Sequence, residues 1–234
     1  KFKIGDNFFL IYSPEREDPG NKLFKSSQIA KIIGGDTKLC SEIGIKLYAK
    51  ITPNIFKVSS SRAAEMTKLL ENVFRAVNIG MVNELKELAE KLNIDIFEVI
   101  KAASTKPFGF IPFYPGPGVG GHCIPIDPYY LSWKAKEYGL STKLIDIAGE
   151  INSRMPTHII KKLIQIFEKK SISIRGSKVL ILGVTYKKNI DDCRESPGLE
   201  IIDQLINLGV IVSYHDPFCP YLNYEKNHKI KLNS

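Results

Sequence analysis

The sequence has 234 residues, of which 44% are hydrophobic and 25% are charged, and its net charge is +8. This composition excludes a disordered or fibrous chain and predicts one or two hydrophobic cores. No apolar run approaches the roughly 20 residues that span a bilayer, so we expect no membrane segment. The 27 Lys and 6 Arg are spread along the chain, which favours a solvated surface over nucleic-acid binding.

The four cysteines, Cys40, Cys123, Cys193 and Cys219, lie far apart and form no C-x-x-C pair. Because no histidines stand at zinc-binding spacing, we expect no metal site. Separated thiols without a signal peptide are typical of a cytoplasmic protein, and we expect that location.

The first sixty residues have the pattern of the end of an α/β domain. Residues 7–12 (NFFLIY) predict a buried strand, and the turn formers of residues 13–21 (SPEREDPGN) follow it. A second strand is expected over 29–35, with a helix behind it. Ligands bind at the carboxyl ends of such strands, so Glu15 is a candidate base and Arg16 a candidate phosphate ligand. An exposed turn is the alternative.

A long helix is predicted from about Ser61 to Leu92. Its apolar residues recur at spacings of three and four: Met66, Leu70, Val73, Val77, Met81, Leu85, Leu88 and Leu92. At roughly 45 Å, a helix of this kind usually spans a domain or forms a subunit interface. Lys68 and Asn72 lie one turn apart and could together hold an oxyanion, although solvent exposure is the default for a lysine.

Further helices and then a strand–helix–strand unit complete the chain. The expected ranges are helices over 95–103, over 128–138 and on to about 170, a strand over 178–183, a helix over 196–209 and a strand over 210–217. Gly183 and Asp216 end the two strands, as in dinucleotide-type folds, where the acidic residue meets a ribose. The loop between them lacks a G-x-G-x-x-G pattern. Lys187 and Arg194 could supply charge to phosphates, or form a basic surface turn.

The Pro/Gly-rich segment 115–123 is the strongest local signal for a ligand site. Its glycines allow the backbone to lie close to anionic oxygens, although a tight turn is the alternative. Asp127 as N-cap predicts a helix start just after Cys123, where the helix dipole favours the reactive thiolate. A buried, unreactive cysteine is the alternative. The adjacent His122 is a poor candidate base, since sequence neighbours rarely face each other.

Four segments resemble the UDP-glucose/GDP-mannose dehydrogenase family, in the order SPEREDPGN, AAEMTKLLEN, FYPGPGVGGHCIPIDPYYL and LGVTYKKNIDDCRESP. They are most similar to its UDP-N-acetylglucosamine 6-dehydrogenase branch. The resemblance implies an α/β fold in three parts. These are the end of a Rossmann-like NAD domain over 1–58, a helical dimerisation domain with the catalytic loop and a long helix over 59–174, and part of a second Rossmann-like, UDP-binding domain over 175–234. The family's NAD-binding glycine motif has no counterpart in this sequence.

The resemblance also implies roles for single residues. Cys123 matches the family's nucleophile, and Lys68 with Asn72 matches its oxyanion and substrate-positioning pair. Asp127 matches a water-organising carboxylate, and Glu15 matches the glutamate used in hydrolysis. Arg194 matches an arginine that reaches NAD, and Lys106 stands where the neighbouring subunit lends a basic residue. The expected substrate-binding residues are Arg16, Lys106, Tyr114, Gly116, Gly118, Gly120, Tyr186 and Lys187.

The implied function is NAD-dependent oxidation of the C6 alcohol of a UDP-hexose to the uronic acid, through a thiohemiacetal and a thioester on Cys123. The implied assembly is a cytoplasmic homodimer joined through residues 61–92 and serving polysaccharide biosynthesis. Ile126 replaces the lysine usual in UDP-glucose enzymes, which points away from UDP-glucose without identifying the sugar. The resemblance to the UDP-N-acetylglucosamine branch makes that sugar the expected substrate, and UDP-N-acetylmannosamine and UDP-glucose are alternatives. Two other classes stay open, a non-redox cysteine enzyme and a non-catalytic dimerisation or UDP-sugar-binding fragment.

Overall fold

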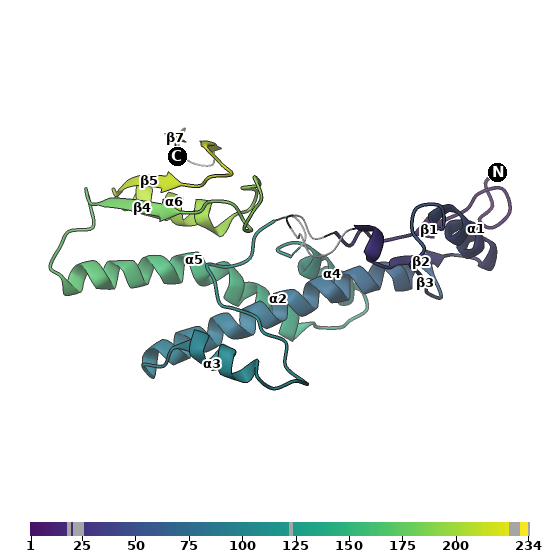
Figure 1. The fold of residues 1–234 in the computed structure, drawn as a ribbon, viewed down its shortest axis with the longest axis horizontal. Helices are drawn as coiled ribbons and strands as arrows, with labels where there is room; N and C mark the ends of the chain where they lie inside the picture. Colours follow the sequence, from purple (N-terminus) through teal and green to yellow (C-terminus); the bar gives the residue numbers. More distant parts are fainter. Residues whose placement is uncertain (18–19, 21–25, 122–123, 225–229, 234) are drawn as a thin grey trace. The chain divides into compact units, whose positions relative to one another are not determined.

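A computed structural model describes residues 1–17, 20, 26–121, 124–224 and 230–233 (Figure 1). The chain forms two compact units, Lys1–Asn72 and Val73–Ser234. Cys123 and His122 lie outside the described residues. Among the helices of the described ranges, none combines the length and the apolar character needed to cross a bilayer.

The first unit contains a small sheet with one helix packed on it. Its elements are β1 (Ile11–Tyr12), the 3-10 helix η1 (Ser26–Gln28), β2 (Lys31–Gly35), α1 (Lys38–Tyr48) and β3 (Ile55–Lys57). β2 lies in the centre, antiparallel to β1 and parallel to β3. The Thr37 hydroxyl caps α1 by accepting a hydrogen bond from the Cys40 N–H, and Ile33 of β2 is fully buried. The predicted strand over 29–35 and the helix behind it are confirmed.

The predicted buried strand over 7–12 is wrong in extent and in burial. Only Ile11 and Tyr12 are in a strand, and the apolar side chains before them remain substantially exposed, as does Tyr12. The reason lies in the partners, because β1 pairs with Gly34 and Gly35, which offer no side chains to pack against. Close approach to Ser60 and Ser41 requires those glycines, since a Cβ at either position would overlap backbone atoms there.

The long helix α2 (Ser61–Lys91) is confirmed, but the predicted apolar stripe is not its buried face. Most of the stripe is exposed, including Met81, Leu85 and Leu88. The buried positions are instead mainly small or polar: Ala64, Ala76, Gly80, Val82, Asn83 and Ala89. Small residues are needed where α5 (Lys143–Lys169) approaches, since a Cβ on Gly80 would come within 3.2 Å of Ala148.

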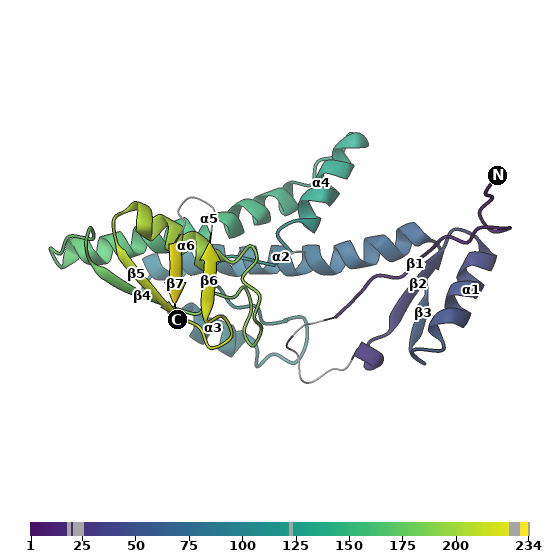
Figure 2. The ribbon, with the colours of Figure 1, turned by 90° about the horizontal axis from the view of Figure 1, so that it is seen from above.

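Helices form most of the second unit up to residue 169. Val82 and Ala89 of α2 pack against Ile96 and Ile100 of α3 (Ile96–Ala103), so that α3 lies beside the C-terminal half of α2 (Figure 2). α4 (Asp127–Glu137) packs on α5. The predicted helices over 95–103 and 128–138 are confirmed within one residue at each end, and the predicted end of the next helix near residue 170 is confirmed by α5.

The predicted N-cap of α4 is wrong. Ile126 holds the cap position without a side-chain hydrogen bond, and Asp127 is already the first helical residue. The physical reason is the backbone at Ile126, which enters the helix in the right-handed region rather than in the extended conformation of a capping residue (φ −114°, ψ −51°). The carboxylate of Asp127 therefore belongs to the first turn of α4, where it still meets the positive end of the helix dipole.

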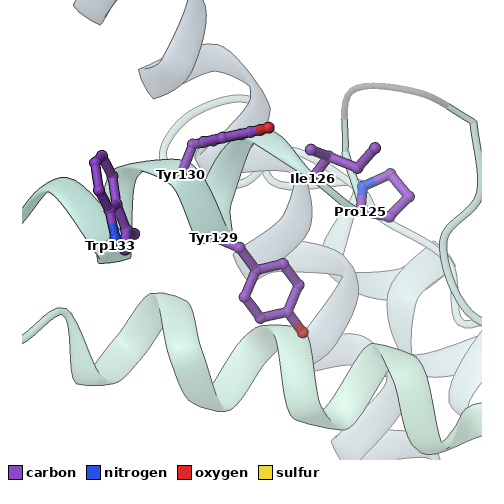
Figure 3. Close-up of a pocket in the computed structure, with 5 residues that line it drawn as sticks. All are labelled: Pro125, Ile126, Tyr129, Tyr130 and Trp133. Atoms are coloured by element: carbon purple, nitrogen blue, oxygen red, sulfur yellow. The ribbon is translucent and has the colours of Figure 1, made fainter.

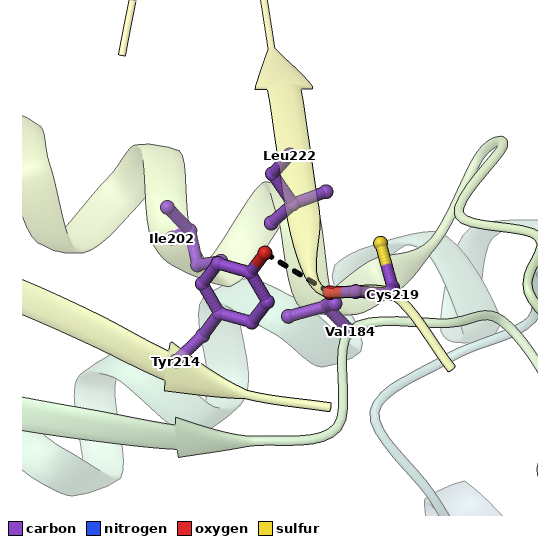
Figure 4. Close-up of a cluster of buried hydrophobic side chains, with 5 residues drawn as sticks. All are labelled: Val184, Ile202, Tyr214, Cys219 and Leu222. Carbon is purple, nitrogen blue, oxygen red and sulfur yellow. Dashed lines mark hydrogen bonds between the residues drawn. The ribbon is translucent and has the colours of Figure 1, made fainter. Parts of the chain in front are cut away.

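The strand–helix–strand unit is confirmed. It consists of β4 (Lys178–Leu182), α6 (Pro197–Asn207) and β5 (Ile211–His215), with β4 and β5 parallel. The hairpin of β6 (Tyr221–Tyr224) and β7 (Ile230–Asn233) was not predicted. Tyr214 fills the core beneath α6, where its hydroxyl donates to the Cys219 carbonyl (3.0 Å), among Val184, Ile202 and Leu222 (Figure 4). A second cluster, with Leu205 fully buried, joins α6 to α5.

Candidate functional site

Within the first unit, the end of the 13–17 segment meets the N-terminal half of α2. The Lys68 ammonium donates to the main-chain carbonyl of Glu15 (2.6 Å). The Glu15 carboxylate in turn accepts from the Lys31 ammonium (2.6 Å). Two of the predicted catalytic residues, 53 positions apart in sequence, therefore lie together in this unit. Asn72 follows one turn after Lys68 and is partly buried.

The charges around Glu15 favour its ionised form. The hydrogen bond from Lys31 is the main cause that lowers the pKa of Glu15, and the positive charges of Lys31 and Lys68 act in the same direction. An ionised carboxylate accepts protons and hydrogen bonds only, which suits a group that orients or deprotonates water. Sequence reasoning missed Lys31, because a lysine at the start of a strand carries no signal of its own.

Arg16 has partners inside the unit. Its guanidinium makes two bonds to the Glu71 carboxylate, Nε to Oε2 (3.2 Å) and Nη2 to Oε1 (2.6 Å), and a third to the Ala30 carbonyl (3.0 Å). This paired geometry is the strong form of an arginine–carboxylate contact. Arg16 thereby ties the 13–17 segment to α2 and keeps Glu15 beside Lys68. Its contact with a substrate phosphate stays a prediction.

Within the second unit, the glycine-rich loop packs closely on its own chain. A Cβ on Gly118 would lie 2.8 Å from the Asn152 carbonyl, and one on Gly120 would lie 2.7 Å from the Glu195 carbonyl. Gly121 has φ +83°, and a Cβ there would meet the Tyr186 ring at 2.9 Å. Glycine is therefore required at these positions for packing inside the protein. Ligand binding is not needed to explain these three glycines.

The same loop meets the predicted cofactor and substrate residues of the segment 184–196. The Gly121 N–H donates to the Arg194 carbonyl (3.3 Å), and Tyr186 covers the loop glycines. The Arg194 guanidinium is exposed and held by the Asp192 carboxylate through Nε (2.9 Å) and Nη2 (2.6 Å), which raises the pKa of Arg194. The main-chain carbonyl of Lys187 accepts from the Thr185 hydroxyl (3.0 Å). The structure thus brings Gly118, Gly120, Tyr186 and Arg194 together.

A cavity of about 470 Å³ opens beside this cluster. It is lined by residues of the loop, of α5 and of the start of α6: Val119, Pro125, Asn152, Ser153, Pro156, Cys193, Arg194, Glu195, Ser196, Pro197, Leu199, Glu200 and Asp203. Ser196 caps α6 by accepting a hydrogen bond from the Gly198 N–H. Because Ser196 lines the cavity, the positive end of the α6 dipole lies beside it. The size and the mixture of apolar walls and polar groups suit a small organic ligand.

Asp216 is held by backbone groups inside the protein. Its carboxylate is buried and accepts hydrogen bonds from the backbone N–H groups of Val184 (2.9 Å), Thr185 (3.2 Å) and Phe218 (2.9 Å). Although burial opposes it, these bonds lower the pKa of Asp216. The carboxylate therefore holds the turn after β4, which leads to Tyr186, and its contact with a ribose stays a prediction.

Three further predicted residues have surroundings of their own. Tyr114 is half exposed and stacks on Phe97, with ring centroids 6.3 Å apart, and the Lys106 ammonium lies over the Phe108 ring at 5.0 Å. No packing of a Cβ constrains Gly116. In the described part of the chain, no three potential ligands gather into a metal site.

A second hollow, about 460 Å³, was not predicted. It lies on α4 and is lined by Pro125, Ile126, Tyr129, Tyr130 and Trp133 (Figure 3). Tyr129 points toward α5, where a Cβ on Gly149 would lie 2.7 Å from its hydroxyl. The aromatic run DPYYLSW gave no sequence signal for a pocket, because it lacks the helical spacing of a single buried face.

The described elements form a mixed α/β fold with a helix-rich central part, and two domain models of one family match the chain. Residues 62–154 match the central domain, and residues 180–234 the UDP-binding domain, of the UDP-glucose/GDP-mannose dehydrogenase family. The chain therefore belongs to this family of nucleotide-sugar dehydrogenases.

Similar proteins carry two substrate names. Protein CapL of Staphylococcus aureus is 40% identical over 91% of the chain, and UDP-N-acetyl-D-glucosamine 6-dehydrogenase of Pseudomonas aeruginosa is 37% identical over 92%. The solved UDP-D-ManNAc dehydrogenase of Pyrococcus horikoshii is 37% identical and covers 93% of the chain with a TM-score of 0.86. The chain spans 50%, 51% and 51% of these three proteins, which is about half their length.

Proposed function

We propose that the protein to which this chain belongs oxidises the C6 alcohol of a UDP-sugar to a carboxylate, with NAD as the hydride acceptor. The observation that carries the proposal is the Lys68 ammonium, fixed on α2 beside ionised Glu15. UDP-N-acetylglucosamine is the first candidate substrate, because a relative 37% identical to this chain is named for that sugar. Ile126, in place of the lysine usual in UDP-glucose enzymes, points away from UDP-glucose. UDP-N-acetylmannosamine is the second, since a similar solved enzyme bears that name.

The residues present fit the NAD expected of the family in part. Arg194 presents an exposed guanidinium, oriented by Asp192, which suits a phosphate oxygen of the cofactor. When bound, NAD accepts one hydride in each of the two oxidations. The alcohol is first oxidised to an aldehyde. The aldehyde carbon is trigonal, so a nucleophile must add before a second hydride can leave.

The chain's own residues supply the remaining chemistry. We assign the addition to the Cys123 thiolate, which forms a C–S bond to the aldehyde and gives a thiohemiacetal. Loss of the second hydride and of the hydroxyl proton leaves a thioester. Lys68 offers its ammonium to the oxyanion, since the ammonium carries three N–H donors and the Glu15 carbonyl takes one of them. Water, oriented by Asp127 and Glu15, then releases the acid and returns the thiol.

The test uses the full-length protein with UDP-N-acetylglucosamine, UDP-N-acetylmannosamine and UDP-glucose in parallel. We expect two NADH per sugar and a carboxylate product by mass spectrometry. Cys123→Ala should abolish acid formation, whereas Cys40→Ala, which removes a buried thiol of the first unit, should retain it. Full acid formation by the Cys123 variant overturns the nucleophile assignment. Hydrolysis without NAD would instead support a non-redox cysteine enzyme, and UDP-sugar binding without turnover a binding fragment.

The proposed setting has support from two further features. The exposed apolar stripe of α2 suits a homodimer interface over residues 61–92. Cys40, Cys193 and Cys219 are free thiols, which suits a reducing cytoplasm. Uronic acid products of this reaction class are building blocks for polysaccharide biosynthesis, and we propose that role.

A further inference from the structure

Two buried amide side chains join three segments of the second unit. Asn83 of α2 is completely buried and Asn152 of α5 is 2% exposed. The Asn83 Nδ2 donates to the Asn152 Oδ1 (3.0 Å), and the Asn152 Nδ2 donates to the Ala76 carbonyl of α2 (2.9 Å). The Asn83 Oδ1 accepts from the Gly116 N–H in the glycine-rich loop (2.9 Å). The three bonds form one continuous chain from the helix pair to the loop.

The direction of every bond in this chain is fixed. The Gly116 N–H is a donor and the Ala76 carbonyl an acceptor, so each amide can face its neighbours in only one orientation. Turning the Asn83 amide over would set an NH₂ group against an N–H. A buried polar group left without a partner is costly, so the chain resists any change in which only one member moves.

Gly116 is the loop glycine that depends most on this bond. Gly118 and Gly120 are held by close packing against neighbouring backbone, whereas a Cβ on Gly116 would meet nothing within 4 Å. The Gly116 position is therefore set by its N–H bond to a rigid, buried acceptor. Tyr114, two residues earlier, is more than half exposed.

We propose that Asn83 is a positioning residue for the UDP-sugar: it fixes the backbone of the glycine-rich loop at Gly116 in the binding conformation, and Asn152 fixes the amide of Asn83. The inference rests on the proposed function for the identity of the ligand. The loop geometry that it explains does not depend on that function. Asn83 acts through the loop and has no role in the bond-making steps.

The test compares Asn83→Ala with Ser132→Ala in the full-length enzyme. Ser132 is also buried in the second unit, where its hydroxyl bonds to that of Thr142 (2.6 Å), so its loss serves as a control for a missing buried hydrogen bond. Losing the Gly116 anchor should raise the KM for the UDP-sugar about tenfold, with the KM for NAD within about twofold of wild type. Ser132→Ala should leave both values near wild type.

Amide hydrogen exchange of peptides covering 114–121 provides a readout that needs no turnover. We expect exchange at least about tenfold faster in Asn83→Ala, and unchanged in Ser132→Ala. If Asn83→Ala does not fold, Asn83→Asp replaces it: an ionised carboxylate cannot donate to the Asn152 Oδ1, so its loop should exchange faster than wild type at neutral pH. Equal loop exchange and equal KM in wild type and Asn83→Ala would overturn the inference. Failure of wild type to bind any UDP-sugar would overturn the proposed function alone.

Discussion

At the scale of single residues, Cys193 and Cys219 place two free thiols in contact within residues 180–234. Their sulfur atoms are 3.0 Å apart, and both are free thiols. Burial, together with the neighbouring Cys219, raises the pKa of Cys193 to about 12. The thiol is therefore protonated and weakly nucleophilic at neutral pH, so Cys193 is a poor competitor for the catalytic role proposed for Cys123.

This raised pKa predicts a loss of stability in alkali. An unfolded cysteine ionises near its ordinary pKa of 9.0, while folded Cys193 stays protonated to about 12. The contribution of the protonated Cys193 thiol to the free energy of unfolding is fully present below pH 9 and declines as the pH rises from 9 to 12. Urea denaturation should show that the free energy of unfolding of the wild type falls between about pH 8 and about pH 10.5. The fall should be smaller in Cys193→Ser than in the wild type. An identical drop in that variant would contradict the assignment.

Glu90 predicts the opposite behaviour in acid. Burial works to raise its pKa, but hydrogen bonds from Lys162 (2.6 Å) and Lys86 (3.0 Å) prevail and lower it to about 2. The resulting stability is present above pH 4.5 and is lost as the pH falls toward 2. Allowing for solvent screening, we expect about 1–2 kcal/mol, measured as the difference between wild type and Glu90→Gln in urea at about pH 7. The two proteins should converge near pH 2.

At the scale of elements, α2 shows how far sequence periodicity can be taken. Spacings of three and four gave its length nearly to the residue. They did not give its buried face, because burial against α5 selects Gly80 and Ala76 for their small size, while the larger apolar residues remain outside. The hydrophobic pattern of a sequence identifies an apolar helix face, but it does not show which element packs on that face. The prediction of a buried strand over 7–12 was wrong for the same reason, since the sequence does not show that this segment pairs with two glycines.

The close crossing of α2 and α5 predicts a steric effect at Gly80. Gly80→Leu places a side chain where even a Cβ would be 3.2 Å from Ala148, and should destabilise the protein by about 1–3 kcal/mol. Glu84→Leu adds the same side chain at an exposed position of the same helix and should change stability by less than about 0.5 kcal/mol. Urea denaturation of both variants measures the difference, and equal effects would refute a steric origin.

At the scale of the whole molecule, the residues to which we assign roles are divided between the two units, and each group is described within its own unit. Lys68, Asn72 and Glu15 belong to the first, and Asp127, Tyr186 and Arg194 to the second. These residues were predicted from short sequence segments that resemble the family. Asn83, Asn152 and Lys31 were not predicted from the sequence, because the role of a buried amide or a paired lysine can be identified only when its hydrogen-bond partner is known.

The outward stripe of α2 predicts self-association. Leu88 is 54% exposed, and Leu88→Asp would place a charge on the proposed dimer interface. We expect the full-length protein to sediment as a dimer and this variant to dissociate at least about tenfold more readily. Glu84→Asp, at another exposed position of α2, is the control that should leave the dimer unchanged. A wild-type monomer at high concentration would exclude an interface on α2.

Lys68 is held by the main chain of residue 15, while the Glu15 side chain bonds to Lys31. Every amino acid has a carbonyl oxygen, so exchanging the side chain at position 15 need not displace the ammonium. Natural variation or engineering at this position could therefore alter the release of the acid while the oxidation steps keep their cation. In the proposed reaction, the oxidation steps and the release of the acid are therefore independently adjustable, because residue 15 would serve the release with its side chain and holds the Lys68 cation with its backbone carbonyl.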